Sequence, residues 1–272
     1  MSSPFRKAII TARLPRQVIL PLQQGASFPL TPLVKVGDEV VEGQKIADTE
    51  KYVSAPLHAP ISGRVTKISS AITITAQAGA QKEALYSGSW AVDELSPGQI
   101  RKIVREAGIV GLREKIETVI INGCEEEPYI AADYRLMLER PADVIYGARA
   151  VAKAVAAEKI IIGLEDNKRG QTDSIKVVVN VGTAVAITEA VKFGKPLIEL
   201  VMTVAGPAIK EPQNLRVRLG TQVAELIEEC GGLIEENARM SMGDPLTGLT
   251  AVTLDMPVLK GTNCLLVGRL EE

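Results

Sequence analysis

The chain of 272 residues has an apolar fraction of 46%, a charged fraction of 24% and a formal net charge of -2. These values are typical of a globular protein with a substantial core, and they exclude the strongly basic field that would hold nucleic acid or an anionic membrane surface. No apolar stretch reaches the ~20 residues that span a bilayer, and residues 1–15 lack the apolar segment of a signal peptide. We therefore expect a soluble, cytoplasmic protein with no nucleic-acid partner.

The cysteine and histidine content indicates neither a disulfide framework nor a metal site. Cys124, Cys230 and Cys264 lie far apart, and His58 is the only histidine. An iron–sulfur cluster usually takes four cysteine thiolates, and a structural zinc ion takes four Cys or His ligands at short spacings. We therefore predict no metal ligands and no iron–sulfur cluster in this chain.

Residues 1–90 read as strands joined by tight turns. The stretch 31–50 alternates apolar and polar residues around the turns Gly37-Asp38 and Glu42-Gly43, and residues 54–68 continue in the same style. Such a pattern predicts a small β-barrel or sandwich with a linker after it. His58 lies between two Ala-Pro pairs, where we favour a structural turn over a proton-shuttle role.

Residues 91–195 alternate helices with short apolar strands. We expect a helix after the N-cap Ser96, buried strands at 118–122, 159–166 and 176–181, and a helix at 182–194 that ends at Gly194. The helical stretch 129–157 must break near Arg140-Pro141, because proline interrupts a helix. This alternation is typical of a parallel α/β layer.

Residues 196–272 indicate a small α+β module. Strands are expected at 197–206 and 214–220. An amphipathic helix at 221–232 follows them, with Thr221 as its N-cap and Gly231 near its C-cap, and more strand comes after it.

An acidic cluster follows the first strand of the parallel layer. Ligands bind at the carboxyl ends of parallel strands, and Pro128 fits the first position of the next helix. Glu125, Glu126 and Glu127 would then lie at the functional edge. Carboxylates at a helix N-terminus are favoured by ~0.3–1 kcal/mol each, which explains one glutamate better than three. A site for ribose hydroxyls or an amide is the alternative.

Several stretches of the chain together resemble the RnfC family, which belongs to the Rnf electron-transport complex, and more distantly the NADH- and flavin-binding subunit of respiratory complex I. The run "INGCEEEPYIAADYRLMLERPADVIYGARAV" followed by "IIGLEDNK" carries the closest likeness. Residues 21–65 are similar to the barrel-sandwich module of RnfC, residues 177–199 to its second nucleotide-site segment, and residues 203–232 to the β-grasp module called SLBB.

The resemblance implies a fold and a function. The fold is a barrel-sandwich hybrid with its linker at 1–90, a truncated NADH/FMN-binding-like parallel α/β domain at 91–195, and an SLBB-like β-grasp module at 196–272. The function is electron transfer from NADH through a flavin to other redox subunits or ferredoxin-like proteins, either in the cytoplasm or peripheral to the inner face of the membrane. FMN and NAD(H) are the implied cofactors. The implied cofactor-binding residues are Asn122, Glu125, Glu127 and Asn180, and no catalytic side chain is implied. Cys124 stands where the complex I pattern has an aspartate.

Two flavin-binding segments of the family have no counterpart here. "GIVG" at 108–111 passes straight to residues 112–122 without a glycine-rich loop, and only a short stretch separates "LEDNK" from "VVVNVGT". Glycine-rich loops bind phosphate through backbone N–H groups. A flavin-less scaffold of a redox complex and a protein for a different ligand are therefore alternatives. A third alternative is a biotinyl or lipoyl carrier modified at Lys51, although its "TEKYV" context favours a solvated turn lysine.

Overall fold

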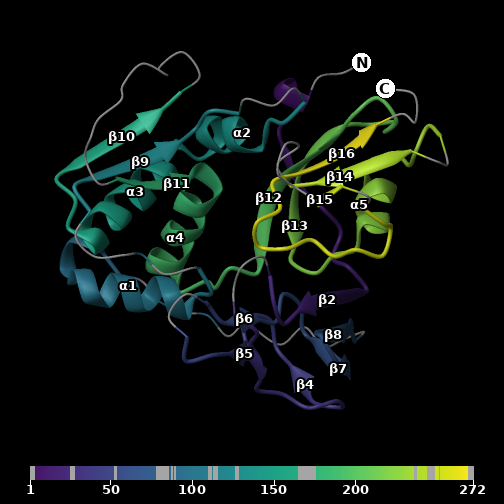
Figure 1. Cartoon of the computed structure of the whole chain (residues 1–272), viewed down its shortest axis with the longest axis horizontal. Coiled ribbons are helices and arrows are strands. Elements are labelled where there is room, and N and C mark those ends of the chain that lie inside the picture. Colours follow the sequence, from purple (N-terminus) through teal and green to yellow (C-terminus); the bar gives the residue numbers. More distant parts are fainter. Residues whose placement is uncertain are drawn as a thin grey trace.

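The structure is a computed structural model that describes residues 4–24, 28–51, 54–77, 86, 88, 90–109, 112, 116–125, 129–164, 176–235, 238–243, 249–250 and 252–268. Three neighbouring parts are visible in Figure 1, each built on its own β-structure: a barrel module, an α/β layer and a β-grasp module. This arrangement confirms the predicted combination of architectures. The boundaries proposed for the domains stay a prediction.

The barrel module consists of two small antiparallel sheets. One has the strand order β2-β8-β7-β4 and the other β3-β5-β6. Alternate residues of β2 are buried, and Leu20, Leu57 and Ile74 belong to the core. Gly37 and Gly43 adopt positive φ in the two predicted turns, a conformation that glycine accepts without strain. The strands are β2 (Gln17–Pro21), β3 (Thr31–Pro32), β4 (Glu39–Val40), β5 (Lys45–Asp48), β6 (Leu57–His58), β7 (Gly63–Ile68) and β8 (Ala71–Ala76).

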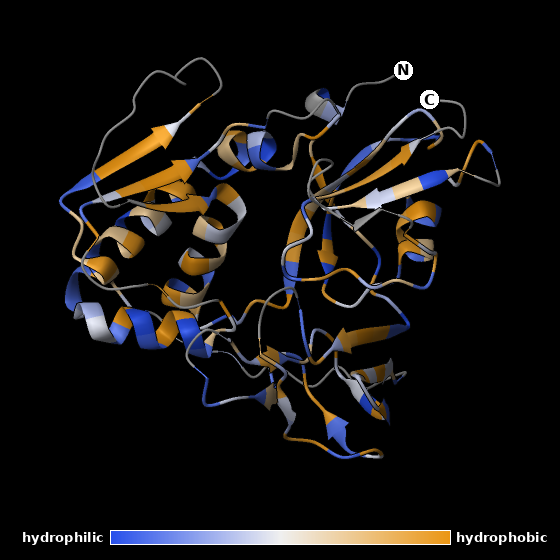
Figure 2. Cartoon of the chain, in the orientation of Figure 1, coloured by the Kyte–Doolittle hydropathy of each residue, from blue (hydrophilic) through white to orange (hydrophobic). Residues whose placement is uncertain are grey.

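The α/β layer is a three-stranded parallel sheet of order β10-β9-β11 with helices packed against it. Figure 2 shows that these strands are hydrophobic over most of their length, as expected of parallel strands. Its elements are α1 (Pro97–Glu106), β9 (Thr118–Asn122), α2 (Ala132–Glu139), α3 (Pro141–Val155), β10 (Lys159–Gly163), β11 (Lys176–Asn180) and α4 (Val181–Phe193).

The helix boundaries of this layer follow the local sequence signals in three places. Ser96 and Gln99 form a capping box at the start of α1. The helical stretch breaks between α2 and α3 at Arg140, with Pro141 in the first turn of α3. Helix α4 ends at Gly194, whose φ of 64° is left-handed. These three predictions are confirmed.

The β-grasp module is a six-stranded sheet of order β1-β13-β12-β16-β14-β15 with helix α5. Its outer strand β1 comes from the N-terminal part of the chain and pairs with β13 in parallel. Thr221 was expected to cap α5, but the N-cap is Gln222, and the Thr221 hydroxyl donates to the carbonyl of Arg218 instead. The elements are β1 (Ile9–Thr11), β12 (Glu199–Ala205), β13 (Gln213–Arg218), α5 (Val223–Glu229), β14 (Arg239–Met242), β15 (Leu249–Thr250) and β16 (Cys264–Gly268).

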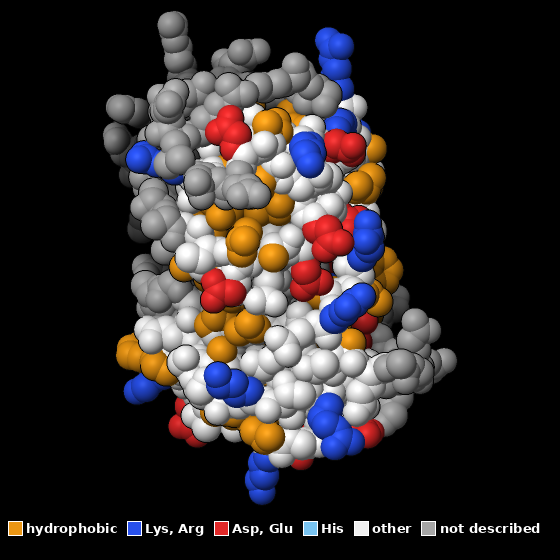
Figure 3. Space-filling view, turned by 90° about the vertical axis from the view of Figure 1, so that its right-hand side faces the viewer, with side chains coloured by type: hydrophobic (Ala, Val, Ile, Leu, Met, Phe, Trp, Pro, Cys, Tyr) orange, Lys and Arg blue, Asp and Glu red, His pale blue; other side chains and the backbone are white. Residues whose placement is uncertain are grey.

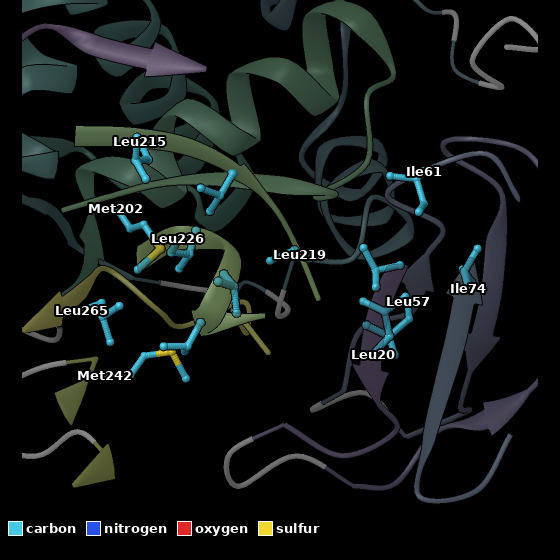
Figure 4. Packing of buried hydrophobic residues seen from close by; sticks show 14 of the residues in the cluster. Leu20, Leu57, Ile61, Ile74, Met202, Leu215, Leu219, Leu226, Met242 and Leu265 are labelled. Atoms are coloured by element: carbon cyan, nitrogen blue, oxygen red, sulfur yellow. The ribbon is translucent and has the colours of Figure 1, made fainter. Parts of the chain in front are cut away.

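The barrel and β-grasp modules share one hydrophobic cluster, whereas the α/β layer has its own. Figure 4 shows Leu20 and Leu57 of the barrel and Met202 and Leu215 of the β-grasp within this shared cluster. On the side seen in Figure 3, acidic and basic side chains are interspersed, in keeping with the small net charge.

Candidate functional site

The three parallel strands bring their carboxyl ends to one edge. Asn122 at the end of β9 is in register with Asn180 on β11 and with Gly163 on β10. Both asparagines are exposed. The structure therefore places Asn122 and Asn180 side by side at the edge where open parallel sheets bind ligands.

Each of these asparagines also organises the backbone that follows it. Oδ1 of Asn122 accepts a hydrogen bond from the backbone N–H of Cys124 at 3.2 Å. Oδ1 of Asn180 accepts one from Thr183 at 2.7 Å and so caps α4. Asparagine is well suited to both tasks, because its short amide reaches backbone donors two or three residues along the chain.

Glu125 caps helix α2. Its carboxylate accepts hydrogen bonds from the backbone N–H groups of Asp133 at 2.8 Å and Tyr134 at 3.0 Å. A negative charge there also compensates the helix dipole. Helix α2 begins at Ala132, four residues later than the expected position of Pro128, and both Pro128 and Glu127 lie outside the described residues.

Asp133 is a site residue that the sequence reasoning missed. Its side chain is almost fully buried, and its Oδ1 accepts a hydrogen bond from the backbone N–H of Gly182 at 3.2 Å. Burial and the nearby negative charge of Glu125 together raise the pKa of Asp133 to about 7. The available signal was a lone aspartate in the first turn of the helix that follows the acidic cluster.

A cleft runs from this edge down between the α/β layer and the β-grasp module. It is lined by residues of α2, α4, β12, β13 and the loop before β16, among them Asp133, Arg140, Asn180, Glu189, Glu199 and Lys260.

The charges in the cleft largely neutralise one another. Arg140 donates to Glu189 at 2.7 Å, and Lys195 donates to Glu199 at 2.6 Å. Arg216 also approaches Glu199, at 3.4 Å. The cleft therefore presents paired ions rather than a field of one sign.

The described residues do not fit a flavin phosphate. Phosphate binds to backbone N–H groups at helix N-termini or in glycine-rich loops. In α4 the N–H groups of Gly182 and Thr183 are taken by Asp133 and Asn180, and in α2 the first donors are taken by Glu125. The residues where flavin loops would lie, 110–111, 113–115 and 165–175, are outside the described part of the chain.

The other expected features are simpler to place. Among the described residues, no group of three or more His, Cys, Asp or Glu side chains could hold a metal ion. Within the same residues, every helix is too short or too polar to cross a bilayer. Lys51 is exposed after β5, and its ammonium group lies 5.8 Å from the centre of the Phe28 ring.

Comparison with known families shows three consecutive matches along the chain. Residues 3–84 match the RnfC barrel sandwich hybrid domain, residues 108–193 match the Nuo51 FMN-binding domain, and residues 201–250 match the SLBB domain. This order of modules defines a class of proteins built on a barrel-sandwich module, a flavin-domain-like α/β layer and a β-grasp module.

Individual relatives extend over nearly the whole chain. The RnfC subunit of the proton-translocating ferredoxin:NAD(+) oxidoreductase complex of Clostridium ljungdahlii is 33% identical over 335 aligned residues, which cover 96% of this chain and 72% of that protein. Its counterpart in the Na(+)-translocating ferredoxin:NAD(+) oxidoreductase complex of Acetobacterium woodii is 29% identical over 326 residues, covering 93% and 73%. The chain belongs to the RnfC family.

The alignments also reveal a difference from these relatives. Both aligned regions are longer than the 272 residues of this chain, so the relatives contain internal segments that this chain lacks. Among solved structures, a chain of an NAD+-reducing [NiFe]-hydrogenase in the air-oxidized state is 15% identical, with a TM-score of 0.49 over 65% of this chain and 47% of that one, a likeness too weak to carry an inference.

Proposed function

We propose that this chain is an electron-transfer subunit of a complex that passes electrons from NADH through a flavin to partner redox proteins. The observation that carries the proposal is the agreement of all three modules, in order, with RnfC relatives that belong to ferredoxin:NAD(+) oxidoreductase complexes. Its partners would be the other redox subunits and ferredoxin-like proteins. The protein would be peripheral on the inner face of the membrane.

In this proposal, the nucleotide lies along the carboxyl edge of β9, β10 and β11. Asn122 and Asn180 would face the nicotinamide and isoalloxazine rings together with Glu125 and Glu127. The support is that the two asparagines are exposed and adjacent there. The bound cofactors would supply the hydride and electron chemistry, and the protein would orient them.

A flavin-less scaffold is the second candidate. It is favoured by the capped N-termini of α2 and α4, which leave their described N–H groups unavailable to phosphate, and by the internal segments present in relatives but not here. In this case the chain would hold redox subunits together without binding FMN tightly.

Flavin content separates the two candidates. The protein is purified without added flavin, and its visible spectrum and NADH titration are recorded before and after incubation with FMN. A bound flavin that NADH reduces supports electron transfer through this chain. If neither FMN nor NADH binds while the protein still assembles with the other purified subunits, the scaffold function is supported.

Substitution of Glu127 tests the site assignment. We expect Glu127→Gln to weaken NADH binding severalfold without unfolding the protein, because it removes an acceptor charge that would face the nucleotide. Glu126→Gln is the matched control, with the same charge change in the same loop. Equal NADH affinity in wild type and Glu127→Gln would remove Glu127 from the site.

A further inference from the structure

Lys260 lies where the three modules meet. It belongs to the loop before β16, and its backbone N–H donates to the side chain of Gln24 at 3.0 Å. Its ammonium group donates to the carbonyl of Pro56, next to β6, and to the carbonyl of Gly108, just after α1, each at 2.7 Å. One side chain of the β-grasp module is therefore bonded to both other modules.

The backbone around this ammonium group is closely packed. Gly108 has a φ of +85°, and a Cβ atom there would lie 2.7 Å from the carbonyl oxygen of Pro56. The same position would lie 3.1 Å from Nζ of Lys260 and 3.3 Å from Nδ1 of His58. The lysine and the imidazole are therefore immediate neighbours around Gly108.

Each of these two side chains has one hydrogen-bonding position left over. An ammonium group has three donors, and two of those of Lys260 are directed to carbonyls. Nδ1 of His58 is buried, and within the described part of the chain it has no hydrogen-bond partner. A buried nitrogen without a partner costs about 1–3 kcal/mol.

The charges around the pair keep the imidazole neutral. The barrel module contributes Lys45 and Asp48 from β5, and α1 contributes Arg105 and Glu106; these four side chains are paired with one another. Burial and then the positive charge of Lys260 lower the pKa of His58 to about 3. A neutral imidazole has one nitrogen that accepts a hydrogen bond.

We propose that Lys260 and His58 form a buried hydrogen-bonded pair, in which the ammonium group donates its third proton to Nδ1 of His58, and that this pair positions the three modules relative to one another. The imidazole then carries its own proton on Nε2. The pair unites the unused donor and the unused acceptor, and it adds a third anchor to the two carbonyls.

The pair responds to pH in a defined way. Burial lowers the pKa of Lys260 to about 7, with Asp48 opposing the shift. When Nζ loses one proton to solvent, the neutral amine keeps two donors for the carbonyls and gains a lone pair. The imidazole must then present its proton at Nδ1, so its tautomer changes as Lys260 titrates. Hydrogen bonds from a neutral amine are weaker than those from an ammonium group, so the junction loosens above the pKa of Lys260.

The single histidine makes this inference directly testable. Full-length protein without a histidine tag is labelled with [15N]histidine, and the two imidazole nitrogens are followed by NMR from pH 5 to pH 9. We expect the Nε2–H tautomer at pH 5 and a shift towards Nδ1–H as the pH rises through neutrality. A tautomer that stays the same over this range, or an Nδ1–H tautomer at pH 5, overturns the proposal.

Variants separate the pair from general effects on the fold. In Lys260→Met the tautomer should no longer change with pH, whereas in Lys210→Met, an exposed lysine of the same module, it should change as in wild type. Hydrogen exchange of the Leu197 amide, which donates to Ala107 across the junction at 2.7 Å, should be severalfold faster in Lys260→Met only. A Lys260→Met protein that titrates and exchanges like wild type contradicts the positioning role. If this variant does not fold, the wild-type titration decides.

Discussion

At the scale of single residues, the acidic cluster that stands out in the sequence has at least one structural task. Glu125 caps α2 with both carboxylate oxygens, and its charge acts on the buried Asp133. Asp133 in turn holds the N-terminus of α4 through Gly182. Local capping and the proposed nucleotide edge therefore use the same few side chains, so substitutions there require a stability control.

The raised pKa of Asp133 predicts a pH dependence of stability. The folded pKa is about 7 and the ordinary value is 3.8, so between these values the folded state binds more protons than the unfolded state. The contribution of Asp133 to stability therefore falls as the pH rises through this window. Since one pKa unit corresponds to ~1.4 kcal/mol, the loss is at most about 4 kcal/mol.

Substitution by asparagine should remove this dependence. Asp133→Asn keeps an acceptor for the Gly182 N–H, so urea unfolding at pH 5 and pH 8 should show the variant gaining stability relative to wild type at the higher pH. Asp93→Asn, at an exposed position on the same layer, is the control. An equal difference between Asp133→Asn and wild type at both pH values would argue against a buried, proton-binding Asp133.

At the scale of elements, the contact between α3 and α4 depends on a glycine. A Cβ atom on Gly147 would lie 2.0 Å from the carbonyl oxygen of Ala184, which is backbone and cannot move aside cheaply. We expect Gly147→Ala to force the helices apart and to destabilise the protein by about 1–3 kcal/mol, the usual cost of overpacking.

The matched control for this substitution is on another helix of the same layer. Gly98 in α1 has room for a methyl group, with only the flexible end of Arg101 at 3.9 Å. Gly98→Ala should therefore be neutral or stabilise by up to about 1 kcal/mol, through the higher helix propensity of alanine. Thermal unfolding of both variants tests the contrast, and equal effects would refute the steric argument.

At the scale of the whole molecule, two cores divide the chain differently from its order in sequence. The barrel and the β-grasp modules share one cluster although the α/β layer lies between them in the chain. The backbone N–H of Ile19 in β2 donates to the carbonyl of Gly220 after β13 at 3.0 Å, which joins the two modules directly. Strand β1 adds a further link, because it completes the β-grasp sheet.

This division predicts which parts lose stability together. Leu20 in the shared cluster and Leu136 in the α/β core are both 1% exposed. Either Leu→Ala substitution should cost about 2–5 kcal/mol. Hydrogen exchange should show that Leu20→Ala weakens protection in both the barrel and the β-grasp sheets, whereas Leu136→Ala acts mainly on the α/β layer. Loss of protection confined to the barrel in Leu20→Ala would show that the shared cluster is not one cooperative unit.

The sequence by itself determined the kinds of elements and several of their ends. Ser96, Pro141 and Gly194 act through local backbone chemistry, which depends on residues only a few positions apart. The same is true of the alternation that identified the parallel layer, and of the placement of Asn122 and Asn180 at strand ends. Signals of this range can be read without knowing the rest of the fold.

Only the tertiary structure decided which distant residues share an environment. It buried Asp133 against α4, moved the cap of α2 to Glu125, joined β1 to the last module, and set Lys260 beside His58 between three modules. Burial, pKa shifts and unpaired polar atoms arise from contacts between segments up to some two hundred residues apart. Spacing along the chain contains no measure of such contacts, which is why these features emerged from the fold alone.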